Sequence, residues 1–308
     1  MTLTEEDRKK SLIKNQHAVV YTIKNNYRKM AALLTDPLRT GPDKFLIIPP
    51  IARGGNWLYE WLEAYSSKQK TGHPAYIQYR PSMDPWIHEF PLLDQLTLEK
   101  NKIKFRTIRE IGVHQNIQNN FSEDQLKNFI NKVLLSSENF QTRRRELSSS
   151  IDKDSLVINI RRGDYYTSPD ISHRFGINTI EYVKKAVPQA FKESHYKKLL
   201  FISDDLKWCR ENLSFLKNFA PVDFKKYGKD MFDDLALLSL AGDIVLTNTT
   251  FGYWGAYIAC IDHPTRVWAA NIHERGGRIN SITGQPIQHL PAWQLVSPDS
   301  TRLSWLDL

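Results

Sequence analysis

A regular alternation of short apolar runs and amphipathic segments between residues 156 and 270 is the feature that most constrains the fold. Four apolar runs predict buried strands, at residues 156–160, 198–202, 244–247 and 266–270. The remaining segments predict helices, at residues 177–191, 206–213, 230–241 and 251–261. Such alternation is typical of a parallel sheet with helices on both faces. Ligands of these sheets bind at the carboxyl ends of the strands, so polar residues that directly follow a strand are candidates for a site.

The first half of the chain shows a weaker form of the same pattern. Three runs predict strands, at residues 45–48, 75–79 and 103–108. Two long amphipathic segments predict helices, at residues 5–35 and 122–147, and the second begins at a capping pattern on Ser122. A glycine loop at residues 52–56 precedes a further helix, so strand, loop and helix follow one another here as well.

The 308 residues are long enough for two domains with a core each. The helix predicted at 122–147 ends in Arg143-Arg144-Arg145, where cations favour the helix dipole, and Ser148-Ser149-Ser150 follows. We place the domain boundary there. The prediction is an α/β protein with residues 1–150 as a first domain that includes the leading helix. Residues 151–308 form a second domain with a C-terminal tail.

The composition is that of an ordinary globular protein, with 41% hydrophobic and 25% charged residues. The charge surplus of 42 − 34 = +8 indicates an anionic partner, but does not choose among nucleic acid, a membrane surface and a sugar nucleotide. No apolar stretch of about 18 residues is present, and the polar start lacks a signal-peptide pattern. We expect a cytoplasmic protein, or a lumenal catalytic domain if an anchor has been removed. A peripheral membrane contact stays open.

Two adjacent arginines directly follow the first strand of the second half, in the run Ile160-Arg161-Arg162-Gly163-Asp164-Tyr165. A guanidinium offers planar, bidentate donors and keeps its charge, which suits a diphosphate. The glycine permits a sharp turn, and Asp164 is placed to pair with one arginine. A surface arginine pair on an ordinary turn is the alternative, and the residues alone do not decide between the two.

Two further strand ends carry polar residues. Ser203-Asp204-Asp205 follows one strand, where acids can bind a ribose or a base edge, or simply cap the next helix. The run Asn248-Thr249-Thr250-Phe251 opens another helix, whose free backbone N–H groups and small hydroxyls predict an anion site. Capping explains only one of these hydroxyls, so this segment is the most specific of the three.

No metal or other cofactor is expected from the residues. Asp152 and Asp154 have the spacing of an acid pair, but they precede their strand and so lie at the wrong edge of the sheet. His273 lacks a second histidine one helical turn away, and the nine histidines form no ligand cluster. Cys209 and Cys260 stand in apolar surroundings and are expected to be core thiols.

Four segments, in order, resemble the α-1,2-fucosyltransferases, which carry a His-x-Arg-Arg-Gly-Asp-Tyr motif. They are Ile160-Arg161-Arg162-Gly163-Asp164-Tyr165, Ser203-Asp204-Asp205-Leu206-Lys207-Trp208-Cys209, Asp234-Leu235-Ala236-Leu237-Leu238 and Thr249-Thr250-Phe251-Gly252-Tyr253-Trp254-Gly255-Ala256-Tyr257. The resemblance is dense from about residue 156 to 270. Two shorter segments are also similar to the family, Gly54-Gly55-Asn56 and Leu290-Pro291-Ala292-Trp293.

The resemblance implies a GT-B-like fold, in which two Rossmann-like parallel-sheet domains flank a cleft. The first domain would bind the acceptor and the second the donor, GDP-fucose. The implied reaction is inverting, metal-independent transfer of L-fucose from GDP-fucose to the 2-hydroxyl of a terminal galactose in a glycan. The implied partners are a nucleotide sugar and a glycan, with no nucleic acid and no cofactor.

The resemblance also assigns roles by position. Arg161 would hold the β-phosphate of the leaving group with Asp164 beside it, and these two are the expected catalytic residues. The expected donor-binding residues are Asn159, Arg161, Arg162, Ser203, Asp204, Asp205, Asp234, Asn248, Thr249, Thr250 and Phe251. The expected acceptor-side residues are Gly54, Gly55 and Asn56.

Two positions depart from the family pattern. Asn159 stands where the family has histidine, and Trp57 stands where glutamine is usual. Candidates for a base lie in the acceptor half, namely Glu60, Asp84, His88 and Glu89. Two alternatives stay open, a glycosyltransferase of the same fold with another nucleotide sugar or acceptor, and a non-catalytic module that binds glycan or nucleic acid.

Overall fold

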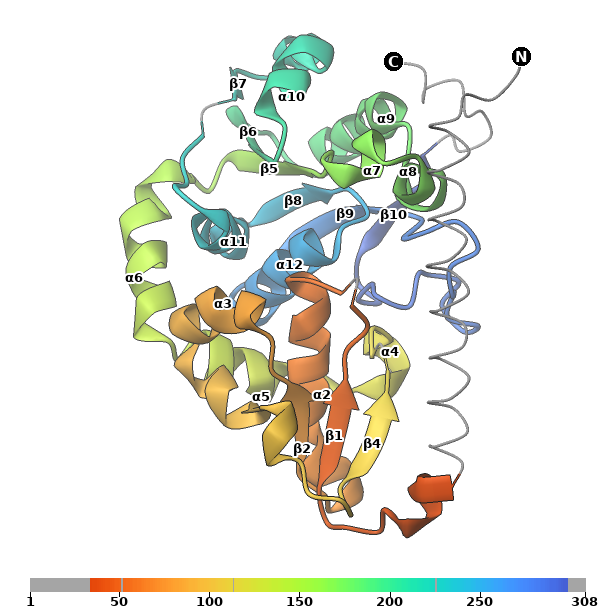
Figure 1. Ribbon diagram of the computed structural model, residues 1–308. Helices are drawn as coiled ribbons and strands as arrows, with labels where there is room; N and C mark the ends of the chain where they lie inside the picture. Colours follow the sequence, from red (N-terminus) through yellow and green to blue (C-terminus); the bar gives the residue numbers. More distant parts are fainter. Residues whose placement is uncertain (1–33, 51, 113, 225, 299–308) are drawn as a thin grey trace, which may run out of the picture.

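The computed structural model describes residues 34–50, 52–112, 114–224 and 226–298. Two sheets lie one above the other in Figure 1, each accompanied by helices. The helix predicted at residues 5–35 lies outside the described residues, apart from its last two positions. None of the helices in the described part of the chain combines the length and the apolarity that a membrane crossing requires.

Four parallel strands form the first sheet, in the order β3-β2-β1-β4. They are β1 (Lys44–Ile47), β2 (Ala75–Gln78), β3 (Thr97–Leu98) and β4 (Ile108–Ile111). The strands predicted at 45–48 and 75–79 are confirmed. The strand predicted at 103–108 is wrong except at its last residue. Phe105 is 59% exposed, and pairing with β1 begins only at Ile108, opposite Lys44.

Helix α2 (Gly55–Thr71) follows β1 and ends at Gly72, which adopts a left-handed conformation. Its buried side chains include Trp57, Leu58, Trp61 and Leu62. Short elements complete the first half. They are η1 (Asp36–Leu38), η2 (Pro81–Met83), α3 (Asp84–Glu89), η3 (Pro91–Leu96), η4 (Lys100–Lys102), α4 (Ile117–Asn120) and η6 (Ser148–Ser150).

The segment 122–147 is helical, as predicted, but it is not one helix. It consists of α5 (Glu123–Phe129), the π-helical turn η5 (Ile130–Leu134) and α6 (Glu138–Leu147). Ser122 forms the predicted capping box with Gln125. Ser137 starts a new helix, because its side chain accepts from the backbone N–H of Phe140.

Six parallel strands form the second sheet, in the order β10-β9-β8-β5-β6-β7. They are β5 (Ser155–Ile160), β6 (Lys198–Ser203), β7 (Val222–Asp223), β8 (Asp243–Leu246), β9 (Arg266–Ala270) and β10 (Gln294–Val296). One face packs on α9 (Thr179–Glu193) and α10 (Leu206–Asn212). The other packs on α11 (Met231–Leu240) and α12 (Thr250–Asp262). The four predicted strands and four predicted helices of this half are confirmed.

Several smaller elements escaped prediction because they are short. β7 and β10 lie at the two edges of the sheet and were not predicted, and β10 follows the last of the four predicted strands. α7 (Asp164–Thr167), α8 (Pro169–Phe175) and η7 (Ser214–Asn218) are also short. Pro188 does not interrupt α9, which runs continuously through it.

The two halves meet through the N-terminal turns of α2 and α12 (Figure 1). A Cβ on Gly55 would lie 2.7 Å from the backbone carbon of Thr250, so only glycine permits this approach. The indole of Trp254 donates to the Gly55 carbonyl at 2.9 Å. One hydrophobic cluster contains side chains from both halves. The first sheet's last strand along the chain ends at Ile111, and the second sheet's first strand begins at Ser155, so the predicted domain boundary lies between them. The boundary itself stays a prediction, because the two halves share a hydrophobic core.

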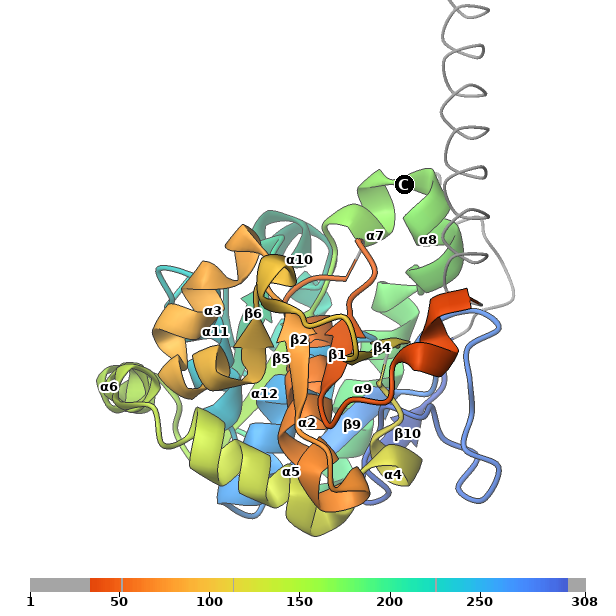
Figure 2. The ribbon, with the colours of Figure 1, turned by 60° about the horizontal axis from the view of Figure 1, so that its bottom comes forward.

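The arginines at the end of α6 do more than favour the helix dipole. Arg143 contacts three carboxylates, those of Glu89 at 3.0 Å, Asp230 at 3.0 Å and Asp233 at 2.6 Å. Arg144 pairs with Asp262 at the end of α12. α6 therefore links α3 of the first half to α11 and α12 of the second, and Figure 2 shows it at the edge of the molecule.

Candidate active site

The loop after β5 holds Arg161 in a defined position at the carboxyl edge of the second sheet. The Arg161 guanidinium contacts Asp164 Oδ1 at 2.7 Å and Asp204 Oδ2 at 2.8 Å. Its backbone N–H donates to Thr247 Oγ1 at 3.0 Å, and Thr247 is fully buried at the end of β8. The Arg161 side chain is 37% exposed, so a ligand can still reach it. Thr247 was not predicted as part of the site, because it reads as the last residue of a strand.

Gly163 makes this arrangement possible. Its φ of 30° lies in the region that disfavours side chains. A Cβ at this position would lie 2.5 Å from Asp204 Oδ2. The turn therefore brings the loop so close to Asp204 that this carboxylate also accepts from the backbone N–H of Arg162, at 2.8 Å.

The charge of Arg161 is secured by its neighbours. Burial alone would lower its pKa, but the carboxylates of Asp204 and Asp164 raise the pKa overall. A permanently charged, pre-oriented guanidinium at a strand end is suited to bind an oxyanion, and it needs no reorganisation as negative charge develops. The predicted pairing of Asp164 with one arginine is confirmed, and Asp204 is a second partner.

The N-terminus of α12 is the second anion-binding element of the site. Thr249 is the N-cap residue, but its side chain makes no capping hydrogen bond. The first-turn N–H groups of a helix have no intrahelical partner, so they remain available to a ligand. Thr250 and Phe251 are partly exposed, whereas Thr249 is 6% exposed. The hydroxyl of Thr250 is thus better placed for a ligand than that of Thr249.

Two residues predicted to bind the donor lie beneath the surface of the site. Asn159 is 4% exposed and donates to the Ile202 carbonyl at 3.1 Å, and a Cβ on Gly252 would lie 2.4 Å from its Oδ1. Asn248 is 2% exposed and donates to the carbonyls of Phe175 and His273. Both side chains hold the strand ends and the start of α12 in place, behind the residues that a ligand can reach.

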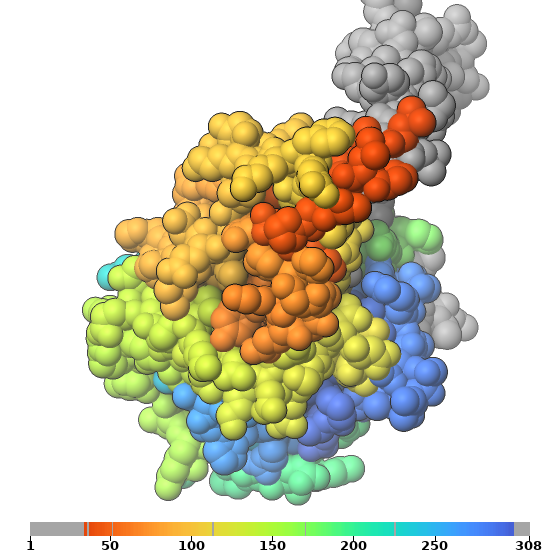
Figure 3. Space-filling model, turned by 90° about the horizontal axis from the view of Figure 1, so that it is seen from below, coloured from red at the N-terminus to blue at the C-terminus, as the bar shows by residue number. Residues whose placement is uncertain are grey.

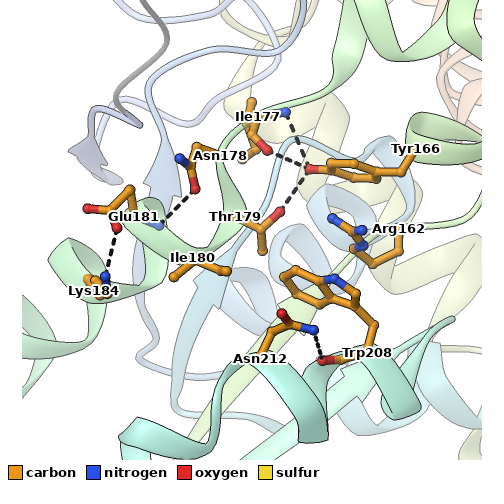
Figure 4. Close-up of a pocket in the computed structure, with 10 residues that line it drawn as sticks. All are labelled: Arg162, Tyr166, Ile177, Asn178, Thr179, Ile180, Glu181, Lys184, Trp208 and Asn212. Carbon is orange, nitrogen blue, oxygen red and sulfur yellow. Dashed lines mark hydrogen bonds and ion pairs between the residues drawn. The ribbon is translucent and has the colours of Figure 1, made fainter. Parts of the chain in front are cut away.

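The second arginine of the pair points into a different pocket (Figure 4). Its guanidinium carbon lies 3.6 Å from the ring centre of Tyr166 and 3.8 Å from that of Trp208. Burial lowers the pKa of Arg162, and no carboxylate forms an ion pair with it among the described residues. The pocket is about 290 Å³ and lies between α10 and the start of α9. Arg161 and Arg162 thus have different environments, and only Arg161 has the two carboxylate partners.

The three polar residues after β6 also differ in role. Asp205 caps α10 by accepting from Trp208 N at 3.0 Å, and Ser203 Oγ accepts from Asp205 N at 3.0 Å. These two are accounted for by the local turn, which is the alternative that the residues left open. Asp204 instead fixes the Arg161 loop.

Asp234 lies in the first turn of α11 with an unusual carboxylate. Its pKa is raised to about 6, mainly by burial and also by the charges of Asp233, Asp230 and Asp204, against the opposing effect of Lys226. Its neighbour Asp233 is paired with Arg143, whereas no hydrogen-bond partner of the Asp234 carboxylate occurs among the described residues. Asp234 is partly exposed, so a ligand can reach this carboxylate, and its shifted pKa makes it a candidate ligand-binding group.

The acceptor-side loop lies at the start of α2, next to the start of α12. Gly54 has a φ of 38°, and Gly55 contacts the start of α12. Asn56 is partly exposed, and its Oδ1 accepts from Gln115 Nε2 at 2.6 Å. Trp57 is 4% exposed and donates to the Ala52 carbonyl at 2.9 Å. Trp57 therefore packs in the core and closes the loop, so the tryptophan that stands in place of the family glutamine does not present an indole at the surface of this loop.

Two of the four candidate bases are engaged elsewhere. Glu60 is 2% exposed and contacts His114 Nδ1 at 2.8 Å. Burial alone would lower the pKa of His114, but the neighbouring Glu60 carboxylate raises that pKa overall. Glu89 is 2% exposed and paired with Arg143, although burial raises its pKa. Asp84 and His88 remain exposed, and Asp84 accepts from the Tyr79 hydroxyl at 2.7 Å.

The described residues contain no group of three or more histidine, cysteine, aspartate or glutamate side chains that could hold a metal ion. This absence does not test whether the enzyme needs a metal, so the expectation of a metal-independent enzyme stays a prediction.

Comparison with known proteins adds a family to this geometry. The family model described as glycosyl transferase family 11 matches residues 85–274, well over half of the chain. The chain is 28% identical over 105 residues to the O-antigen biosynthesis glycosyltransferase WbnK of Escherichia coli, a match covering 34% of each chain. It is 31% identical over 139 residues to galactoside 2-alpha-L-fucosyltransferase SEC1 of Bos taurus, covering 44% of this chain.

The matched segments span only 34% and 36% of the lengths of these two relatives. Among solved structures, NodZ α-1,6-fucosyltransferase soaked with GDP-fucose aligns over 70% of this chain and 92% of that chain, with 14% identity and a TM-score of 0.44. The two parallel sheets with flanking helices confirm the predicted α/β, GT-B-like architecture. The family match contains all four ordered motifs, and the chain belongs to glycosyl transferase family 11, the family of the α-1,2-fucosyltransferases.

Proposed function

We propose that this protein transfers L-fucose from GDP-fucose to the 2-hydroxyl of a terminal galactose in a glycan, with inversion at the fucose carbon and without a metal. The family membership and the name of the bovine relative support the sugar and the linkage. The observation that carries the chemistry is the Arg161 guanidinium, held by two carboxylates at the same sheet edge as the uncapped N-terminus of α12.

The departure of GDP from the sugar builds negative charge on the β-phosphate. Arg161 and the backbone N–H groups of Thr250 and Phe251 are fixed positive groups that stabilise this charge without a metal ion. Asp164 and Asp204 keep the guanidinium oriented. The acceptor approaches from the side of Asn56, at the start of α2.

Asp234 is the group that we assign to the base of the donor. An ionised carboxylate only accepts hydrogen bonds, so it complements a base edge with two neighbouring donors, such as the N1–H and N2–H of guanine. The pKa of about 6 leaves most of this carboxylate ionised at neutral pH.

Calorimetry with GDP tests the proposal most directly. Wild-type protein should bind GDP with micromolar affinity, and EDTA should leave that affinity unchanged. Arg161→Ala should abolish binding, with Arg145→Ala as a control, because Arg145 is an exposed arginine on α6 that pairs with Glu138 of the same helix. Transfer assays should show turnover with GDP-fucose and a galactoside, but not with UDP-galactose or GDP-mannose. Retained glycan binding without any nucleotide effect would instead favour a non-catalytic module.

A further inference from the structure

Three side-chain amides connect the acceptor-side loop to the loop before β10. Gln115 Nε2 donates to Asn56 Oδ1 at 2.6 Å, and Gln288 Nε2 donates to Gln115 Oε1 at 3.1 Å. We call these three residues the amide row. Its members come from the start of α2, the segment before α4 and the segment before β10, so they are far apart in sequence.

The segment that carries Gln288 is firmly docked against the first half of the chain. The backbone N–H of Ile117 donates to the Ile287 carbonyl at 2.9 Å, and Gln118 Nε2 donates to the His289 carbonyl at 3.0 Å. On its other side, the Tyr257 hydroxyl donates to the Gln288 carbonyl. Figure 3 shows the blue C-terminal segment against the yellow segment that contains α4. The amide row therefore rests on a fixed support.

The row determines which end of the Asn56 amide is available to a ligand. A carboxamide accepts through its oxygen and donates through its nitrogen. Because Gln115 is a donor to Asn56, the oxygen of Asn56 is engaged. No hydrogen-bond partner of Asn56 Nδ2 occurs among the described residues, and Asn56 is partly exposed. Asn56 thus presents a hydrogen-bond donor.

The burial of Gln288 indicates that its amide has a directional role. Gln288 is 4% exposed, and its Oε1 is buried without a hydrogen-bond partner. An unpaired buried acceptor costs stability, whereas an apolar side chain of similar length would avoid that cost. The Gln288 amide donates the hydrogen bond that orients Gln115, which an apolar side chain could not do.

We propose that Gln115 and Gln288 are positioning residues that orient Asn56, so that its Nδ2 donates to an oxygen of the acceptor sugar. The inference rests on the proposed function, because it assigns Asn56 to the acceptor. The start of α2 adjoins the start of α12, where the donor phosphates are assigned, so Asn56 lies where acceptor and donor would meet. A donor at Nδ2 suits a neutral sugar, whose hydroxyl and ring oxygens accept hydrogen bonds.

The variant Gln115→Glu tests the orientation. A glutamate accepts on both oxygens, so it keeps the bond from Gln288 Nε2 but would draw Asn56 Nδ2 toward itself. We expect the KM for phenyl β-D-galactoside to rise by about tenfold, as for the loss of one good hydrogen bond. The KM for GDP-fucose and the Kd for GDP should stay within about twofold, because the row does not contact the donor edge. Gln288→Leu should give a smaller rise in the acceptor KM.

Gln118→Glu is the matched control, because Gln118 docks the same segment without contacting Asn56. It should leave the acceptor KM near the wild-type value even if its melting temperature falls. In an Asn56→Ala background, Gln115→Glu should have no further effect on the acceptor KM.

Equal KM changes in the two glutamate variants, or additive effects with Asn56→Ala, would overturn the proposal. Failure of the proposed function is distinguishable, because it would appear in the wild type as absence of fucose transfer.

Discussion

The loop after β5 and the loop after β1 have nearly the same backbone but opposite chemistry. Gly163 and Gly54 both have positive φ, 30° and 38°, and both directly precede a helix. The first loop is held by ion pairs among Arg161, Asp164 and Asp204. The second is held by neutral amides, from Asn56 to Gln115. One turn geometry thus serves two purposes, presentation of a fixed charge to a diphosphate and presentation of an oriented dipole to a neutral sugar.

Removal of the fixed charge should have the largest effect. Arg161→Ala should lower kcat by about 10² to 10³, or roughly 3–4 kcal/mol, the usual cost of losing one donor that stabilises a developing oxyanion. The measurement is steady-state GDP-fucose turnover at saturating acceptor. Asn56→Ala should mainly raise the acceptor KM. If both variants lost kcat equally, the division of labour between the two loops would be wrong.

An alanine at each glycine tests the loops separately. Both substitutions strain a positive φ, at about 1–3 kcal/mol of folding stability each. Gly163→Ala should in addition weaken GDP binding by tenfold or more, because its Cβ would lie 2.5 Å from Asp204 Oδ2. The nearest atom to a Cβ on Gly54 is Trp86 Cζ2, at 3.3 Å, so Gly54→Ala should leave GDP affinity unchanged. Calorimetry together with thermal melts separates these outcomes.

The pH dependence of GDP binding should follow Asp234. Since burial raises its pKa to about 6, the carboxylate is protonated below that pH, so it loses its charge and one oxygen becomes a donor that cannot accept from the base edge. We expect GDP affinity to fall by about tenfold from pH 7 to pH 5. The same raised pKa means that the charge destabilises the free protein above pH 6.

Asp234→Asn is the matched control for this titration. It should weaken GDP binding at pH 7 and remove the pH dependence, without lowering Tm. A variant that keeps the wild-type pH profile would show that another group titrates.

Arg162 should show the smallest effect, although it adjoins Arg161. Arg162→Lys loses a planar group stacked between Tyr166 and Trp208, which should cost about 1–2 kcal/mol of stability and lower Tm. The kcat should stay within about threefold of wild type. A loss as large as that of Arg161→Ala would show that both arginines contact the donor.

The strand–helix order could be predicted from sequence because it depends on local periodicity. The strands β1, β2, β5, β6, β8 and β9 were predictable, since each is an apolar run between amphipathic helices. β7 and β10 were not, because two or three residues at a sheet edge carry no periodic signal. The break at Ser137 inside the predicted helix at 122–147 depends on where α5 and α6 each pack.

The chemical identity of the site was also largely contained in the sequence. Residues that directly follow parallel strands must gather at one edge of the sheet, and this places Arg161, Asp204 and Thr250 together. The ordered motifs then assigned the family. The positions of these residues along the chain, directly after strands, therefore determined which side chains could form the site.

Only the tertiary structure decided which of these groups are accessible and how they are oriented. Asn159 and Asn248 are buried, and Arg162 faces Tyr166 and Trp208 instead of a carboxylate. Glu60 is paired with His114, and Asn56 is oriented by Gln115. Burial, ion pairing and amide direction depend on contacts between residues distant in sequence, because the free energy of a polar group depends on its partners in space, and no local pattern records those partners.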